Sequence, residues 1–72
     1  MGFTMTTLEI IGFLEANGFW KLRTGRHPIM TNGEKTLPIP VHKGDLPKGT
    51  VSGILQQAGF RTKQAKEWKE RG

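Results

Sequence analysis

The segment HPIMTNGEKTLPIPV, residues 27–41, decides the fold because it holds two short strand patterns on either side of a turn signal. The turn is Asn32-Gly33, a pair typical of tight β-hairpins because both residues accept a positive φ. We therefore predict one strand over residues 27–31 and an antiparallel partner over residues 35–40.

The second of these strands has a clear apolar pattern and two prolines. Leu37, Ile39 and Val41 alternate along the sequence, so we expect them on the face that meets the core. Pro38 and Pro40 lack the N–H group that a ladder hydrogen bond needs, and proline is confined to edge strands or to positions whose N–H side is free. We therefore expect this strand at an edge of the sheet.

Toward the N-terminus, residues 19–23 have the pattern of a further strand, and a helix is expected before it over residues 7–17. Thr6 and Glu9 have the spacing of a capping box, in which two side chains satisfy free backbone N–H groups. An Asn-Gly pair ends the helix, since glycine adopts the left-handed conformation of a C-cap. The residues before it, 1–5, are expected to form a frayed leader. The apolar stripe of the helix comprises Leu8, Ile10, Ile11, Phe13 and Leu14.

Toward the C-terminus, a second helix is expected to begin near Pro47 and to end at Gly59. The tail over residues 61–72 is basic and helix-prone, and Trp68 would dock it on the body or on a partner. We therefore predict one domain over residues 1–60, an α+β fold of order α-β-β-β-α with two helices on one face of a three-stranded antiparallel sheet. The apolar stripe of the second helix comprises Val51, Ile54, Leu55 and Ala58.

Length and composition limit the protein to a few functional classes. With 72 residues the chain has room for one domain and for no deep cofactor cleft. The absence of cysteine excludes disulfides, thiol nucleophiles and cysteine-ligated zinc. No apolar run approaches the roughly 18 residues of a membrane span, and the pattern of a signal peptide is missing, so we expect a cytoplasmic protein without a membrane partner. A net charge of +5 favours an anionic partner such as nucleic acid.

The positive charge is concentrated after residue 20, because residues 1–20 contain two acids and neither Lys nor Arg. Cations of the predicted sheet, of the following loop and of the second helix start are candidate phosphate contacts. A plain solvated surface explains any one of them equally well. The candidate RNA-binding residues are Lys21, Arg23, Arg26, Lys35, Lys43 and Lys48.

His27 is the residue best suited to acid–base chemistry, and it lies in the basic, glycine-containing turn RTGRHP, residues 23–28. Histidine accepts and donates protons near neutral pH. Next to a phosphodiester it would act as general base on a ribose 2′-OH or as general acid on the leaving 5′-oxygen. Arg23 and Arg26 would stabilise the charge of the transition state. An exposed histidine that only adds polarity to the turn is the alternative interpretation.

The other polar residues support weaker hypotheses. His42 is a candidate phosphate contact, a second acid–base group or a plain loop residue. Residues 45–50, DLPKGT, open the second helix and form either an anion-binding helix start or an ordinary capped one. No histidine pair at zinc-ligand spacing is present, so we expect no metal and no small-molecule cofactor.

Two segments of the sequence resemble a known family. The run LPIPVHKGDLPKGTVSGILQQAGF, residues 37–60, is similar to the C-terminal half of HicA mRNA interferase toxins, and LEANGF, residues 14–19, is similar to their first helix and its exit. The resemblance covers residues 7–60. It implies a double-stranded-RNA-binding-domain-like fold of the predicted order. It also implies the toxin of a type II toxin–antitoxin system: an endoribonuclease that cleaves mRNA without metal through one catalytic histidine, which a HicB antitoxin covers.

The same resemblance implies that His27 is the catalytic residue. The family usually has Gly-Ser-His before a strand, and Gly25-Arg26-His27 matches its Gly and His with Arg in place of Ser. An alternative alignment places the family histidine on Gly25; we prefer His27 because it leads into the predicted strand. His42 matches a family histidine that is not usually assigned the chemistry.

Three functional hypotheses follow. The first is a toxin-type endoribonuclease acting through His27 on mRNA. The second is a non-catalytic RNA-binding module that recognises A-form helices by shape and phosphate contacts and needs no histidine. The third, which supplements the first, is an interaction protein whose basic face meets an acidic antitoxin.

Overall fold

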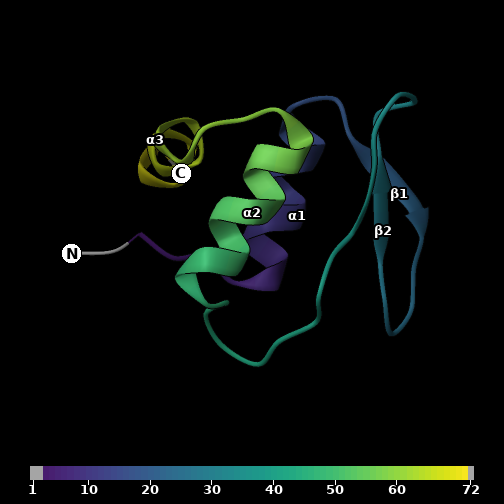
Figure 1. Ribbon diagram of the computed structural model, residues 1–72, viewed down its shortest axis with the longest axis horizontal. Coiled ribbons are helices and arrows are strands. Elements are labelled where there is room, and N and C mark those ends of the chain that lie inside the picture. The colour runs from purple at the N-terminus through teal and green to yellow at the C-terminus, as the bar shows by residue number, and fades with distance from the viewer. Residues whose placement is uncertain (1–2, 72) are drawn as a thin grey trace.

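The computed structural model describes residues 3–71 and contains three helices and three strands. The strands form one antiparallel sheet in the order β1-β2-β3. The helices lie to one side of this sheet, and α1 and α2 run in the same direction (Figure 1). The expected α+β fold is confirmed, with a third helix in addition. The elements are α1 (Thr7–Ala16), β1 (Trp20–Arg23), β2 (Ile29–Thr31), β3 (Thr36–Pro38), α2 (Lys48–Ala58) and α3 (Thr62–Arg71).

The register of the sheet assigns its side chains to two faces. Lys21, Met30 and Leu37 are aligned across the three strands, and cross-strand partners point to the same face. Met30 and Leu37 are 0% and 5% exposed and belong to the hydrophobic core, so this face meets the helices. The opposite face, called the open face from here on, carries Trp20, Arg23, Ile29, Thr31, Thr36 and Pro38.

The strands are shorter than predicted. β2 begins at Ile29, so His27 lies in the bend before the strand and does not lead directly into it. β3 covers only Thr36–Pro38 and lies at an edge of the sheet, as its prolines indicated. The N–H group of Ile39 donates to the carbonyl of Pro28 at 2.8 Å, which continues the contact between the two segments beyond the ladder.

The turn between β2 and β3 contains four residues, 32–35, and differs from the predicted hairpin turn in its backbone conformation. Gly33 has a positive φ of 94°, but Asn32 does not have a positive φ. Instead, Asn32 Oδ1 accepts the N–H groups of Glu34 and Lys35 at 2.9 and 2.7 Å. Asn32 therefore shapes the turn through its side chain, as asparagine does in Asx turns, and not through a left-handed backbone.

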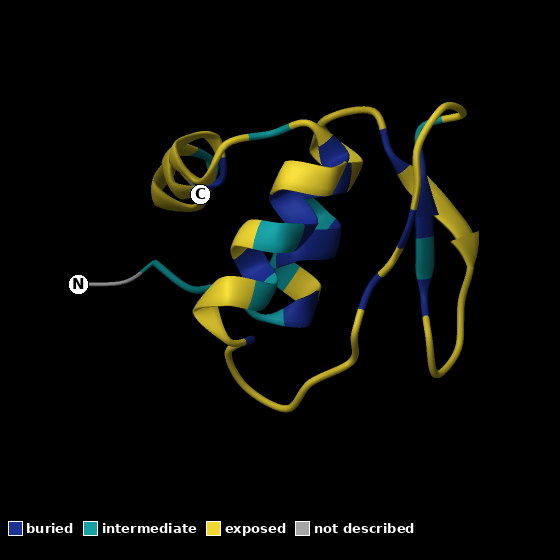
Figure 2. Ribbon diagram, viewed as in Figure 1, coloured by how far each residue is buried: buried dark blue, intermediate teal, exposed yellow. Residues whose placement is uncertain are grey.

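The core between the helices and the sheet confirms most of the predicted stripes and corrects two residues. Leu8 is 79% exposed, because Thr7 and not Leu8 continues the i, i+3, i+4, i+7 pattern of Ile10, Ile11 and Leu14. Val41 is 61% exposed, because the chain has left the sheet there and the strand alternation no longer applies. Figure 2 shows buried positions on α1, on α2 and on β2.

The N-terminal segment is anchored to the start of α1. The capping box is confirmed, since Thr6 Oγ1 accepts the N–H group of Glu9 at 3.2 Å and the Glu9 carboxylate accepts the N–H group of Thr6 at 2.9 Å. Met5 is 0% exposed, and its carbonyl accepts the N–H group of Leu46 at 2.9 Å. The prediction of a frayed leader is therefore wrong for Met5, and residues 1–2 lie outside the described residues.

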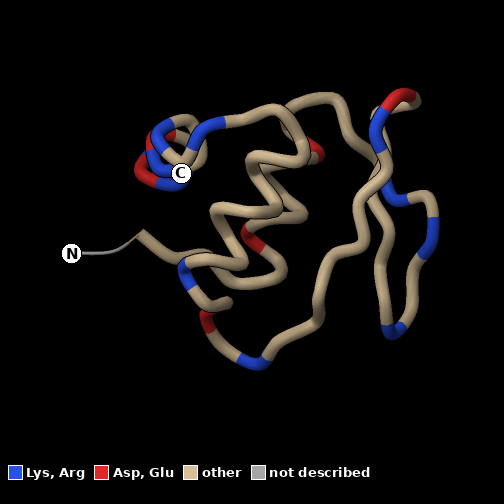
Figure 3. The backbone as a smooth tube through the Cα atoms, in the orientation of Figure 1, with Lys and Arg blue, Asp and Glu red and all other residues tan. Residues whose placement is uncertain are grey.

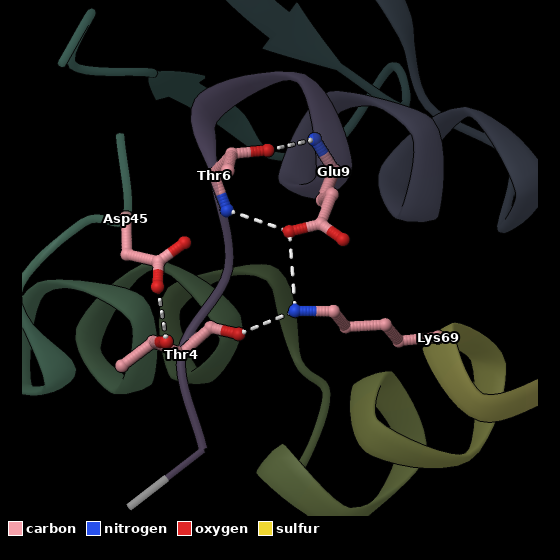
Figure 4. A network of polar contacts seen from close by, with 5 residues as sticks. All are labelled: Thr4, Thr6, Glu9, Asp45 and Lys69. Carbon is pink, nitrogen blue, oxygen red and sulfur yellow. Dashed lines mark hydrogen bonds and ion pairs between the residues drawn. The ribbon is translucent and has the colours of Figure 1, made fainter. Parts of the chain in front are cut away.

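The C-terminal tail packs on the body as α3. Ala65 is 0% exposed, and the Trp68 ring meets the Phe13 ring edge-on with 5.7 Å between centroids. Lys69 Nζ lies 3.3 Å from the Glu9 carboxylate and donates to the carbonyl of Thr4 at 3.1 Å (Figure 4). Of residues 62–71, Ala65 therefore belongs to the hydrophobic core, and Trp68 packs against it.

Candidate functional site

The loop between β1 and β2, residues 24–28, presents His27 to solvent. Its residues 24–27 are exposed, and Gly25 has a φ of 111°, a conformation that side-chain-bearing residues rarely adopt. The backbone of Pro28, which is buried, ties the loop to Ile39 as described above. Within residues 3–71, no side chain of this loop makes a hydrogen bond. The imidazole of His27 is thus accessible and is not engaged in holding the fold.

The structure brings only some of the predicted cations near this loop. Lys21 and Arg23 lie on β1, which leads into the loop, and Arg26 lies within it. Lys35 is at the opposite end of the sheet, because an antiparallel hairpin places successive turns at opposite ends. There its Nζ lies close to the end of α2, at 2.7 Å from the Cβ position that Gly59 lacks. Figure 3 shows both groups of Lys and Arg, while α1 carries none.

The connection from β3 to α2 is fixed by Thr7 at the start of α1. Thr7 is 9% exposed; its Oγ1 donates to the carbonyl of Pro40 at 3.0 Å and accepts the N–H group of His42 at 3.1 Å. His42 and Lys43 are themselves exposed. The structure therefore fixes the backbone of His42 and leaves its imidazole at the surface.

One end of the molecule collects these segments. Both α1 and α2 begin at the lower end of the view, where the 24–28 loop also lies (Figure 1). The Pro28–Ile39 hydrogen bond and the Thr7 contacts connect the loop, the connection and the start of α1 in turn. The candidate site is therefore this end, with His27 in the loop and His42 in the connection.

The two helix starts at this end differ in electrostatics. α1 begins with the Thr6–Glu9 capping box, and the Thr6 N–H group is the main cause that lowers the pKa of Glu9 from its ordinary value, with Lys69 adding to the effect and burial opposing it. α2 begins after Pro47 without a side-chain cap, and Asp45 accepts from Thr4 Oγ1 instead (Figure 4). The start of α2 therefore keeps free N–H groups, which favour an anion.

Within residues 3–71, no group of three or more His, Asp or Glu side chains lies close enough together to bind a metal ion. None of the described helices has the length and apolar character of a membrane span.

Comparison with known families matches residues 9–60 to the model for the HicA toxin of bacterial toxin–antitoxin systems. This match covers more than half of the 72-residue chain. The chain belongs to the HicA toxin family. Membership makes it a toxin-family component of a toxin–antitoxin system, as the resemblance implied. A comparison with curated proteins gives no match.

The HicA match contains every predicted site residue, while α3 lies outside it. Sequence reasoning missed two residues of this HicA protein that the structure makes conspicuous. Thr7 holds the connection near the site, and its place in the i, i+3, i+4, i+7 pattern was the available signal. Trp20 is 50% exposed on the open face, and no local sequence signal distinguishes it from a core aromatic.

Proposed function

We propose that this HicA-family protein is an endoribonuclease that cleaves mRNA, with His27 as its general acid–base group. The observation that carries the proposal is the accessible imidazole of His27, in a loop none of whose side chains makes a hydrogen bond within the described residues. Residues that a fold does not need and that lie on an exposed loop are typical of functional sites. Family membership supplies the toxin role that such an activity would serve.

The proposed reaction is a transesterification within the RNA, in which the phosphorus moves from a 5′-oxygen to the adjacent 2′-oxygen. His27 removes the proton of a ribose 2′-OH, and the 2′-oxygen forms a bond to the adjacent phosphorus while the bond from phosphorus to the 5′-oxygen breaks. The departing 5′-oxygen takes up a proton from water, and His27 returns the proton it removed to the solvent, so the products are a 2′,3′-cyclic phosphate and a 5′-OH end. Positioned acid–base catalysis of this kind contributes about 10²- to 10⁴-fold. Arg23 and Arg26 would stabilise the added negative charge on the phosphoryl oxygens.

The phosphate contacts of this proposal divide into two groups. Lys21, Arg23 and Arg26 lie on β1 and in the loop that holds His27. Lys43 and Lys48 belong to the connection and to the uncapped start of α2, which lie at the same end of the fold. Lys35 remains a candidate contact only for RNA that extends to the other end of the sheet.

The proposed partner, besides mRNA, is a HicB-type antitoxin that covers His27. The support is membership in a toxin–antitoxin family together with the basic surface around the loop, since a net charge of +5 favours an acidic partner. We place both partners in the cytoplasm, where mRNA is translated.

The test is a cleavage assay with a matched histidine control. Purified protein is incubated with a long transcript in EDTA, and the new ends are analysed. We expect cleavage to 2′,3′-cyclic phosphate ends by the wild type, loss of cleavage in His27→Gln and retained cleavage in His42→Gln. Full activity of His27→Gln would show that the catalytic assignment is wrong. Intact RNA with salt-dependent retardation by all three proteins would instead support the non-catalytic RNA-binding module.

A further inference from the structure

We propose that the open face of the sheet binds single-stranded RNA, with the Trp20 indole as a platform on which one base stacks. The inference rests on the proposed function and narrows it, because it names the substrate as a single strand. The observation behind it is that Trp20, a large aromatic residue, is 50% exposed on a sheet face that no helix covers within residues 3–71.

The indole of Trp20 is half-exposed and lies along the surface of the sheet. Trp20 pairs with Thr31 across the β1–β2 ladder, and the tip of its ring reaches the turn, where Cη2 lies 3.6 Å from the Cβ position that Gly33 lacks. The ring therefore extends over the end of β2.

The charge around Trp20 fits a polyanion. Arg23 shares the open face with Trp20, and Lys21 is exposed on the same strand. Residues 16–33 contain no Asp or Glu, so no carboxylate of this segment opposes a phosphate backbone. An exposed aromatic side chain with basic side chains beside it is a combination with which proteins bind single-stranded nucleic acid, where bases stack and cations follow the backbone.

The aromatic platform selects a single strand over a duplex. Bases in an A-form duplex are stacked on each other, so proteins recognise such helices by shape and phosphate contacts, whereas unpaired bases are free to stack on aromatic side chains. Three residue steps along β1 separate Trp20 from Arg23, about 10 Å at the usual rise of a strand. A strand whose base lies on Trp20 would thus pass Arg23 and then reach the His27 loop within a few nucleotides.

A second copy of the chain is a poorer partner for this side of the sheet, whose free edge is β1. Two β1 strands that paired edge to edge would bring Lys21 and Arg23 close to the same cations of the other copy, and opposed like charges are destabilising. An RNA strand has the opposite charge and makes use of the ring.

The test measures binding separately from cleavage. Trp68→Phe leaves Trp20 as the only tryptophan, since the chain contains two. This protein is titrated with a 2′-O-methyl oligonucleotide, as a single strand and as a duplex, and the fluorescence is recorded. The oligonucleotide lacks the 2′-OH nucleophile, so the result does not depend on His27. We expect the single strand to quench Trp20 fluorescence and the duplex to leave it unchanged.

Substitutions of Trp20 complete the test. Trp20→Leu is expected to weaken single-strand binding about tenfold, whereas Trp20→Phe, which keeps a stacking surface, should retain most of the affinity. Unchanged emission together with unchanged affinity of Trp20→Leu would overturn the proposal, as would equal quenching by the duplex. If Trp20→Leu lowers only the melting temperature, the ring is a structural cover for Thr31 and the proposal is wrong.

Two further outcomes distinguish this inference from the function on which it rests. Quenching by a HicB-type antitoxin and not by RNA would make the open face a protein interface and overturn the inference, while leaving His27 chemistry untouched. Conversely, normal cleavage by His27→Gln with intact quenching of Trp20 would refute the catalytic assignment and leave the platform standing.

Discussion

The two turns of the sheet differ in what their residues contribute to folding. In the 32–35 turn, Asn32 Oδ1 accepts two backbone N–H groups, Thr31 Oγ1 accepts the N–H group of Gly33, and the N–H group of Asn32 donates to Lys35. In the 24–28 loop, no side chain makes a hydrogen bond within the described residues, and the one backbone contact beyond the strands is that of Pro28. The first turn is built by its side chains; the second leaves the side chains of residues 24–27 exposed and free for a ligand.

The sharpest way to break this comparison is to substitute His27. We expect His27→Gln to reduce RNA cleavage by about 10²- to 10⁴-fold, because an acid–base group is removed. Because the imidazole is exposed and makes no hydrogen bond within residues 3–71, the melting temperature should stay within the experimental error. Activity and thermal unfolding are measured on the same preparation. A large loss of stability would show that the loop has a structural role and that the two turns are alike.

The second prediction concerns the other turn. Asn32→Ala removes the acceptor of two backbone N–H groups and should destabilise the fold by about 1–2 kcal/mol, in the range of lost capping contacts. For a domain of this size that lowers the melting temperature by about 4–8 °C per kcal/mol. Cleavage per folded molecule should be unchanged at a temperature where the variant is folded. The control is Glu34→Ala, whose side chain is exposed and whose N–H donor remains. If Asn32→Ala lost cleavage while keeping full stability, the distinction between a structural 32–35 turn and a functional 24–28 loop would be contradicted.

Local sequence signals predicted the helices and the presence of the hairpin. The Thr6–Glu9 capping box has the expected geometry, because a cap depends on four consecutive residues and on nothing distant. Asn32-Gly33 did mark the turn, but the four-residue form depends on how β2 and β3 align, which the pair alone does not determine. Leu8 shows the same limit, since apolar character alone did not separate it from Thr7 in the buried pattern.

The candidate site was predictable as a set of residue types but not as an arrangement. His27 and its arginines were recognised from their spacing, and the structure leaves His27 and Arg26 exposed in one loop and Arg23 exposed at the end of β1. The separation of Lys35 from that loop follows from strand pairing, a long-range property. The role of Thr7 and the exposure of Trp20 depend on which elements cover which face, and that is decided by packing between segments distant in sequence.

The third prediction compares one cation from each turn. Arg26→Ser replaces the loop arginine with the residue usual in the family and removes a positive charge next to His27. We expect weaker binding of a single-stranded oligonucleotide. The slope of the logarithm of the binding constant against the logarithm of the salt concentration should become smaller in magnitude by about 0.7, the value for one lost phosphate contact on a single strand. Lys35→Ser is the matched control: although Lys35 adjoins the turn that the Trp20 ring reaches, its Nζ lies beside Gly59 at the end of α2, on the helix side of the sheet. Equal effects of the two substitutions on a short oligonucleotide would mean that both turns contact the same RNA.

The last and smallest prediction extends the comparison to the two helix starts, one capped and one open. The Thr6 N–H group lowers the folded-state pKa of Glu9 below its ordinary value of 4.5, so the unfolded state binds more protons in the acidic range. The stability that Glu9 contributes is therefore complete above pH 4.5 and is lost as the pH falls through the lower folded-state pKa. Glu9→Gln should make the free energy of unfolding less dependent on pH in this range. We expect the difference to be about 0.2–1 kcal/mol, because the pair with Lys69 is partly exposed.

The measurement is urea unfolding from pH 7 down to pH 3, with Glu15→Gln as the control. Glu15 is exposed on the same helix and has no ion pair among residues 3–71, so its substitution leaves the Glu9–Lys69 pair in place. Identical pH profiles for wild type and Glu9→Gln would show that the capping box contributes no charge-dependent stability. In that case the two helix starts would differ only in hydrogen bonding. The start of α2 would then suit an anion because its N–H groups are free, and not because its first turn lacks an acidic residue.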